Sequence, residues 1–113
     1  MNNPEGLIKK LRLIPHPEGG YYAESFRDEK GNVSLIYYFL KKGQISHWHK
    51  LTKNEILHFY DGDPLIVYLS KDGINTEQKI LNNNEDLLSH LIVKSGTWFS
   101  METKGEFSLI GCT

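Results

Sequence analysis

The chain has 113 residues, 39% hydrophobic and 24% charged, with thirteen lysine and arginine residues against fourteen acidic residues and a formal net charge of −1. This length predicts a single domain over residues 1–113, and the one cysteine, Cys112, excludes an internal disulfide and favours a reducing, cytoplasmic location. The balanced charge argues against nucleic acid or an anionic membrane surface as a partner, and no apolar run approaches the roughly 20 residues that span a membrane.

The first expected element is a short helix over residues 3–13. Asn3 is a favourable N-cap, and apolar residues recur at helical spacing along one face of the segment. Pro15 and Pro17 then force an extended backbone. Residues 1–18 are therefore expected to hold a short helix and an extended lead-in.

Residues 19–113 are expected to form β structure, because short apolar and aromatic runs alternate with turn sequences rich in Gly, Asn or Asp. The expected strands are Gly20–Arg27, Val33–Leu40, Gln44–His49, Glu55–Tyr60, Leu65–Ser70, Ile74–Leu81, Leu87–Val93, Thr97–Met101 and Glu106–Cys112. Short strands with hairpin-length connections predict an all-β sandwich, barrel or jelly roll.

Two of these segments, Ser34–Leu40 and Leu65–Leu69, are apolar on both faces. A strand in an isolated sandwich has a polar outer face, so these segments indicate that the outer surface of one sheet is covered. The simplest cover is a second copy of the chain, which predicts a homodimer. Cover by the N-terminal helix is the alternative.

The strongest chemical signal is a group of histidines between residues 47 and 58. On a regular strand His47 and His49 point to the same face, and Glu55 opens the next strand. Two imidazoles and one carboxylate with open positions suit a catalytic divalent ion such as Zn, Fe, Mn or Ni. His58 lies three residues after Glu55, so it faces the other way unless a bulge intervenes.

At these residues the sequence resembles the first motif of the cupins, in which a histidine pair is followed by a glutamate and a glycine. The matching residues are His47, His49, Glu55 and Gly62. Together with Pro17-Glu18-Gly19-Gly20-Tyr21 and Gly62-Asp63-Pro64-Leu65, they resemble small single-domain cupins of the cupin superfamily 5 type, whose function is uncharacterised. The resemblance extends from about Leu13 to Thr113.

This resemblance implies an all-β, single-domain jelly-roll (cupin) barrel, RmlC-like and similar in shape to nucleotide-sugar epimerases. It also implies a dimer and a ligand pocket in the mouth of the barrel. The sequence departs from the pattern at Phe99, which stands where the second cupin motif supplies a histidine. A phenyl ring cannot bind a metal, so a site with one divalent ion and a site with none both stay open.

Further candidates for substrate binding lie near the start and along the strands of the barrel. Glu18, Tyr22 and Glu24 belong to its first long strand and the approach to it, His58 follows Glu55, and Trp98 offers a ring for stacking on a sugar. Regular alternation puts Glu24 and Arg27 on opposite faces. His16, between two prolines, is interpreted as a surface-loop residue.

The predicted function is binding of a small polar or sugar-like molecule in the barrel pocket, with isomerase, epimerase or lyase activity. His47, His49 and Glu55 are the candidate catalytic residues and the candidate metal ligands. Without a metal, a neutral histidine removes a proton next to a carbonyl group. The alternatives are a non-catalytic sensor or binding module, and a structural dimer with a vestigial pocket.

Overall fold

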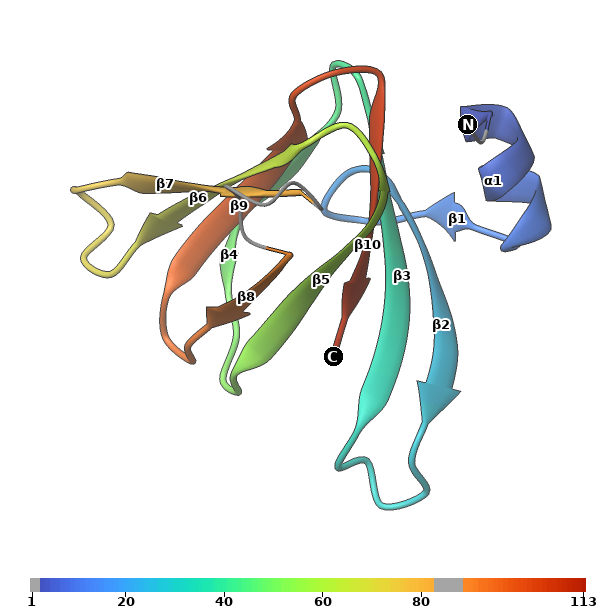
Figure 1. Cartoon of the computed structure of the whole chain (residues 1–113). Coiled ribbons are helices and arrows are strands. Elements are labelled where there is room, and N and C mark those ends of the chain that lie inside the picture. The colour runs from blue at the N-terminus through green and yellow to red at the C-terminus, as the bar shows by residue number, and fades with distance from the viewer. Residues whose placement is uncertain (1–2, 83–88) are drawn as a thin grey trace.

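The computed structural model describes residues 3–82 and 89–113 (Figure 1). Its elements are α1 (Pro4–Lys10), β1 (Ile14–Pro15), β2 (Tyr21–Arg27), β3 (Ser34–Lys41), β4 (Ile45–Lys50), β5 (Glu55–Gly62), β6 (Leu65–Ser70), β7 (Glu77–Leu81), β8 (His90–Val93), β9 (Trp98–Thr103) and β10 (Phe107–Cys112). The predicted strands are present with small changes of boundary. The first residues of the expected Leu87–Val93 strand lie outside the described residues.

The strands form two antiparallel sheets that face each other as a jelly roll (Figure 1). One sheet has the order β1-β2-β3-β10-β5-β8 and the other the order β4-β9-β6-β7. Apolar side chains from both inner faces form the core, including the fully buried Leu57, Val67 and Phe99. The predicted all-β jelly roll is confirmed. Within the described residues, no helix is long and apolar enough to cross a membrane.

Helix α1 packs on the outer face of the six-stranded sheet. Its Leu7 joins Phe39, Phe107 and Leu109 in a second apolar cluster, so the chain's own helix covers part of β3 and β10. The Asn3 side chain caps the helix by accepting hydrogen bonds from the backbone N–H groups of the first turn. The helix is shorter than expected because it ends in a tight C-terminal turn with a left-handed residue just beyond the cap.

Irregular pairing decides which side chains face the interior. In β4, the register with β9 shifts between Ser46 and His49, so both residues point inward opposite Met101 and Phe99. In β2, the register with β3 shifts between Glu24 and Phe26. In each strand, one extra residue cancels the two-residue alternation on which a sequence interpretation relies.

The lead-in to β2 crosses between the two sheets and closes one side of the jelly roll. The backbone N–H of His47 in β4 donates to the carbonyl of Glu18 at 2.8 Å. Gly19 has a left-handed backbone with φ of 108°, and a Cβ atom there would collide with the carbonyl oxygen of Ile45. Gly19 thus lets the lead-in to one sheet approach the backbone of the other sheet.

Candidate functional site

Polar side chains from four parts of the chain gather between the sheets. They are His16 and Glu18 before β2, Tyr38 in β3, His49 in β4 and Glu55 at the start of β5. The rings of His16 and Tyr38 lie 5.1 Å apart. His49 affects the pKa values of His16 and Glu55, and Glu18 and Glu55 affect the pKa of Tyr38, so these side chains lie near one another. We call these five residues the interior cluster.

His49 is oriented by its own strand and by the core. Its ring lies 4.3 Å from that of the buried Phe99, its partner across the β4–β9 pair. Its Nδ1 atom lies 2.8 Å from the carbonyl oxygen of His47. A carbonyl can only accept a hydrogen bond, so Nδ1 carries the hydrogen. In the neutral ring, Nε2 therefore keeps its lone pair and can act as a base.

His16 has the opposite arrangement. Its Nδ1 atom accepts the backbone N–H of Glu18 at 2.9 Å, so the hydrogen of the neutral ring is on Nε2. Burial lowers the pKa of His16, Glu18 opposes this change, and His49 adds to it. A lowered pKa favours the neutral ring, which is a hydrogen-bond donor through Nε2. The prediction that His16 is a surface residue is wrong, because the ring is half-buried against Tyr22 and Tyr38.

Glu55 faces inward beside Leu57 and opposite Val93 of β8. Burial raises the pKa of its carboxyl group, and His49 partly opposes this effect. Glu55 is therefore able to hold a proton closer to neutral pH than an exposed glutamate. The Cys112 thiol is fully buried, and burial followed by the charge of Glu55 raises its pKa well above the ordinary value, which keeps it a neutral thiol.

Tyr38 and Ser46 line the inner end of the cluster. The Tyr38 hydroxyl donates to the carbonyl of Gly19. Burial raises the pKa of Tyr38 to about 12. The nearby Ser46 hydroxyl opposes this rise, and Cys112, Glu18 and Glu55 add to it. Ser46 Oγ is close enough to influence Tyr38 but makes no hydrogen bond of good geometry within the described residues, and it is fully buried.

The structure brings together some of the residues proposed from the sequence and separates others. Glu18, His49 and Glu55 belong to the interior cluster. Tyr22 and Glu24 lie beside it on the inner face of β2, opposite the inward-facing Tyr38 and Ile36.

His47, His58 and Trp98 do not join the interior cluster. His47 is exposed, because it and Trp48 form the outward part of the bulge between the inward-facing Ser46 and His49. His58 lies on the outer face of the six-stranded sheet, where its ring stacks near Tyr60 and its Nε2 is 3.2 Å from the Thr113 hydroxyl. Trp98 lies on the outer face of the four-stranded sheet, under the ammonium group of Lys50. The predicted common face of His47 and His49 is therefore wrong.

The residues present do not fit a metal ion. With His47 turned outward and Phe99 beside His49, the expected set of ligands is reduced to His49 and Glu55. In the described part of the chain, no group of three or more His, Cys, Asp and Glu side chains is arranged to hold a metal ion. Stable binding of a catalytic ion usually takes three protein ligands.

A hollow of about 420 Å³ leads from the surface to Glu55. It lies between the β2–β3 turn and the β4–β5 turn and is lined by Arg27, Gly31, Asn32, Val33, Ser34, Leu51, Thr52, Lys53, Asn54, Glu55 and Thr113. This size suits a small ligand. Glu55 is the residue that this hollow shares with the interior cluster.

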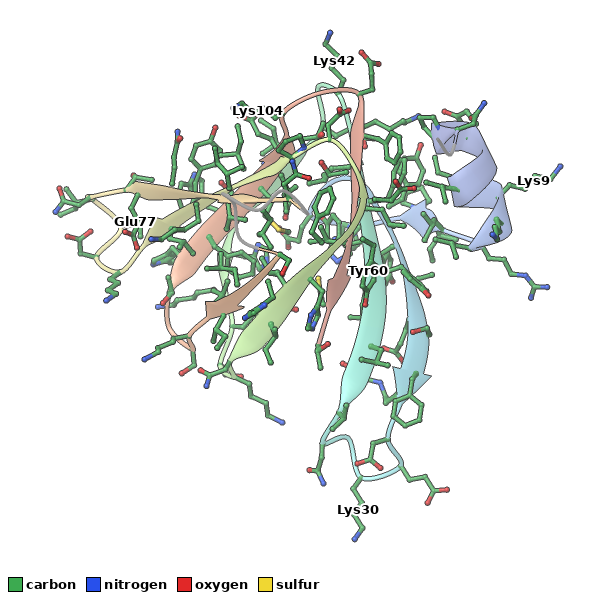
Figure 2. All side chains as sticks on the ribbon, in the orientation of Figure 1. Lys9, Lys30, Lys42, Tyr60, Glu77 and Lys104 are labelled. Atoms are coloured by element: carbon green, nitrogen blue, oxygen red, sulfur yellow. The ribbon has the colours of Figure 1, made fainter. Side chains whose placement is uncertain are left out.

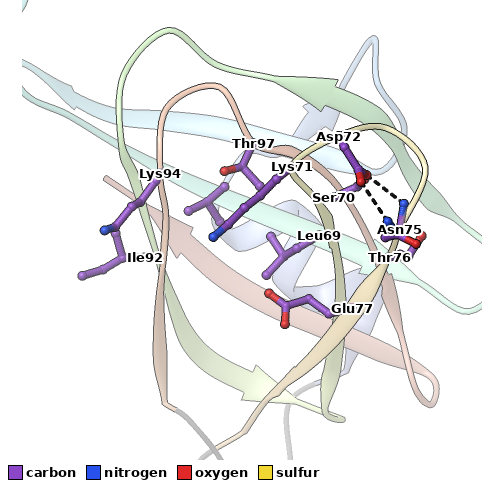
Figure 3. A pocket seen from close by; sticks show the side chains of 11 residues that line it. Leu69, Ser70, Lys71, Asp72, Asn75, Thr76, Glu77, Ile92, Lys94 and Thr97 are labelled. Atoms are coloured by element: carbon purple, nitrogen blue, oxygen red, sulfur yellow. Dashed lines mark hydrogen bonds between the residues drawn. The ribbon is translucent and has the colours of Figure 1, made fainter.

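A larger hollow of about 540 Å³ lies between the β6–β7 and β8–β9 turns (Figure 3). Its wall includes Lys71 and Glu77, but its lining has no histidine and no residue of the interior cluster. Asp72 in this wall is occupied by hydrogen bonds to the backbone and side chain of Asn75, which shape the turn. The smaller hollow at Glu55 is therefore the better candidate for an active site.

A family model described as "Cupin superfamily (DUF985)" matches residues 5–113. The structure is similar to protein SO0799 from Shewanella oneidensis, with 31% identity, a TM-score of 0.92 and coverage of 99% of this chain and 77% of the other. A hypothetical protein from Leishmania major has 28% identity, a TM-score of 0.85 and coverage of 98% and 80%. The CENP-C cupin domain of Drosophila melanogaster shares the fold at 19% identity, with a TM-score of 0.68 and coverage of 88% and 73%. No curated protein matches the sequence.

Proposed function

The chain belongs to the cupin superfamily, in the family described as Cupin superfamily (DUF985), and from this premise we propose that its interior cluster is the active site of a metal-independent isomerase or epimerase. The substrate is a small polar molecule with a carbonyl group. It enters through the hollow at Glu55 and reaches His49. The observation that carries this proposal is the pair of opposite histidine tautomers, one accepting and one donating, beside a carboxyl group whose pKa is raised by burial.

In this reaction, Nε2 of His49 removes the proton from the carbon next to the carbonyl group. The electron pair of the broken C–H bond forms a carbon–carbon double bond, and the carbonyl oxygen takes a proton from Glu55 to give a neutral enol. The Nε2–H of His16 stabilises this oxygen by a hydrogen bond. For a substrate with a hydroxyl group on that carbon, His49 returns the proton to the former carbonyl carbon while the hydroxyl gives its proton to Glu55, which moves the carbonyl group and restores both residues. For epimerisation, a proton from solvent adds to the first carbon from the other face, the enol O–H returns its proton to Glu55, and His49 releases its proton to solvent.

The test is to incubate the protein in D₂O with hydroxyacetone, dihydroxyacetone, dihydroxyacetone phosphate or pyruvate. Proton NMR then measures how fast the carbon-bound hydrogens of each compound exchange for deuterium. We expect exchange above the buffer rate for at least one compound, and a loss of roughly 10²–10⁴-fold in His49→Gln. His58→Gln is the matched control, because His58 lies on the outer face. Equal exchange rates in the wild type and His49→Gln, or no exchange of any compound, contradict the proposal.

The alternative of a non-catalytic binding module gives a different result in the same experiment. A compound that raises the melting temperature of the wild type while its hydrogens do not exchange supports a sensor or carrier. The same compound should lose its stabilising effect in Glu55→Gln, because Glu55 lines the hollow.

We further propose that the chain forms a homodimer through the outer face of the six-stranded sheet. Beyond the area that α1 covers, this face exposes Phe26, Leu35, Tyr60 and Ile92, each at least 40% accessible. Figure 2 shows Tyr60 over the middle of this sheet. Exposed apolar side chains on one sheet face support an interface with a second copy of the chain.

Sedimentation equilibrium tests the dimer. We expect a dimer for the wild type and a monomer for Ile92→Lys. Ile74→Lys is the control, because Ile74 is 84% exposed in the β6–β7 turn, away from this face. A monomeric wild type, or a dimeric Ile92→Lys, contradicts the proposed interface.

A further inference from the structure

The mouth of the hollow at Glu55 holds an arginine, Arg27, that forms an ion pair with Glu24. The register shift in β2 puts Arg27 opposite Ser34 of β3, on the same inner face as Glu24. Nε of Arg27 donates to Oε1 of Glu24 at 3.0 Å, and its Nη2 donates to Oε2 at 2.8 Å. The expected separation of Glu24 and Arg27 on opposite faces is therefore wrong.

This ion pair uses one edge of the guanidinium group and leaves another edge open. A guanidinium group has five N–H donors, and Glu24 occupies the edge formed by Nε and Nη2. Both hydrogens of Nη1 and one of Nη2 stay available, and these two nitrogens form the edge that binds a carboxylate or phosphate in a bidentate manner. Glu24 thus acts as a positioning residue that orients the open edge of Arg27.

The lining of the hollow supports the binding of an anion. Lys53 lines the hollow together with Arg27 and has no ion pair among the described residues. Asn54 also lines it, and its side-chain oxygen accepts the backbone N–H of Ser95, so its amide N–H group stays available as a donor. Glu55 is the one acidic residue in the lining. The hollow therefore has cationic and neutral donors in its wall and a single acidic side chain, Glu55, where it meets the interior cluster.

We propose that the substrate carries a carboxylate or phosphate group that Arg27 and Lys53 bind at the mouth of the hollow, while its carbonyl group lies deeper, beside Glu55 and His49. This inference rests on the proposed function, because it assigns the substrate class of the same site. It divides the site into an outer part that selects the anion and an inner part that moves protons.

The test compares the binding of matched probes to the full chain by NMR titration of backbone and side-chain N–H groups. Acetone and pyruvate differ by a carboxylate, and dihydroxyacetone and its phosphate differ by a phosphate, so the two pairs identify the preferred anion. We expect one anion to bind at least about tenfold more tightly than its uncharged partner, with a preference that weakens as salt is added.

Arg27→Gln should reduce the ratio of the dissociation constants of the uncharged and charged probes to nearly one, and Lys53→Gln should reduce this ratio in part. Glu24→Gln should also reduce it, since it frees the guanidinium group from its fixed orientation. Arg12→Gln is the charge-matched control, because Arg12 is exposed and does not line the hollow. Arg27 is itself exposed, so its replacement should leave the fold intact, which circular dichroism verifies.

Several results overturn the inference. These are equal binding of charged and uncharged probes, an unchanged preference in Arg27→Gln, and no binding of either anion below about 10 mM, a weak limit for ligands of this size. His49→Gln separates the two proposals. This variant should abolish hydrogen exchange and keep the preference for the anion. The exchange measurement therefore tests the proposed function, the binding measurement tests the anion site, and each can fail without affecting the other.

Discussion

The Nδ1 atom of His49 lies 2.8 Å from the carbonyl oxygen of His47, and this contact fixes which nitrogen of His49 faces the interior as a base. The two residues belong to one strand, so the orientation is set locally by the bulge rather than by a distant partner. The exposed His47 contributes through its backbone alone. Its side chain is free to change without loss of the tautomer.

The first prediction concerns the two tautomers. In long-range nitrogen–proton NMR spectra at pH 8, His49 should carry its hydrogen on Nδ1 and His16 on Nε2, because their Nδ1 atoms face a carbonyl and an N–H group, respectively. His47→Ala should leave the His49 tautomer unchanged, since the backbone carbonyl remains. Observation of the same tautomer in both rings would remove the basis for their separate roles.

The second prediction concerns stability and pH. Burial raises the pKa of Glu55 above the ordinary 4.5, so between these two pKa values the folded chain binds more protons than the unfolded chain. The contribution of Glu55 to the free energy of unfolding therefore falls as the pH rises through this window. Glu55→Gln should remove this slope and raise the stability at pH 7, as measured by urea unfolding from pH 4 to pH 8. Glu106→Gln, at an exposed position, is the control.

The third prediction concerns the missing metal ligand. Phe99→His places an imidazole beside His49, and together with Glu55 it should create a site for Co²⁺ with visible absorption bands that the wild type lacks. The substitution should cost roughly 3 kcal/mol of stability without metal, because Phe99 is fully buried. Tight binding of Co²⁺ by the wild type, lost in His49→Ala, would show that the chain assembles a metal site without residue 99.

The fourth prediction compares two buried serines. Ser46 Oγ has no hydrogen bond of good geometry, whereas Ser108 Oγ donates to the carbonyl of Asp63 at 2.6 Å. Ser46→Ala should change the free energy of unfolding by less than about 0.5 kcal/mol, and Ser108→Ala should lower it by about 1–2 kcal/mol. Thermal or urea unfolding measures both. A larger loss in Ser46→Ala than in Ser108→Ala would mean that the Ser46 hydroxyl is paired in solution.

The sequence was a good guide to the elements and a poorer guide to the site. Turn residues and apolar runs mark each strand locally, so strand boundaries such as Leu65–Ser70 can be predicted from the amino-acid sequence. The inward faces of β2 and β4 do not, because each contains a register shift with no distinctive residue to signal it. The interior position of His16 cannot be predicted from the sequence for another reason. Its position depends on the approach of Gly19 to Ile45 in the other sheet, a contact between distant parts of the chain.

The extra residue in β4 also affects how this chain is aligned with other proteins. Two residues, His47 and Trp48, lie between the inward-facing Ser46 and His49, where a regular strand has a single outward residue. A histidine of another protein that aligns with His47 or His49 in sequence therefore need not occupy the same position in space. A relative that lacks one residue in this bulge would still have inward residues at the positions of Ser46 and His49. If the alignment gap is placed one position away, the role of His49 is assigned to a side chain that faces solvent.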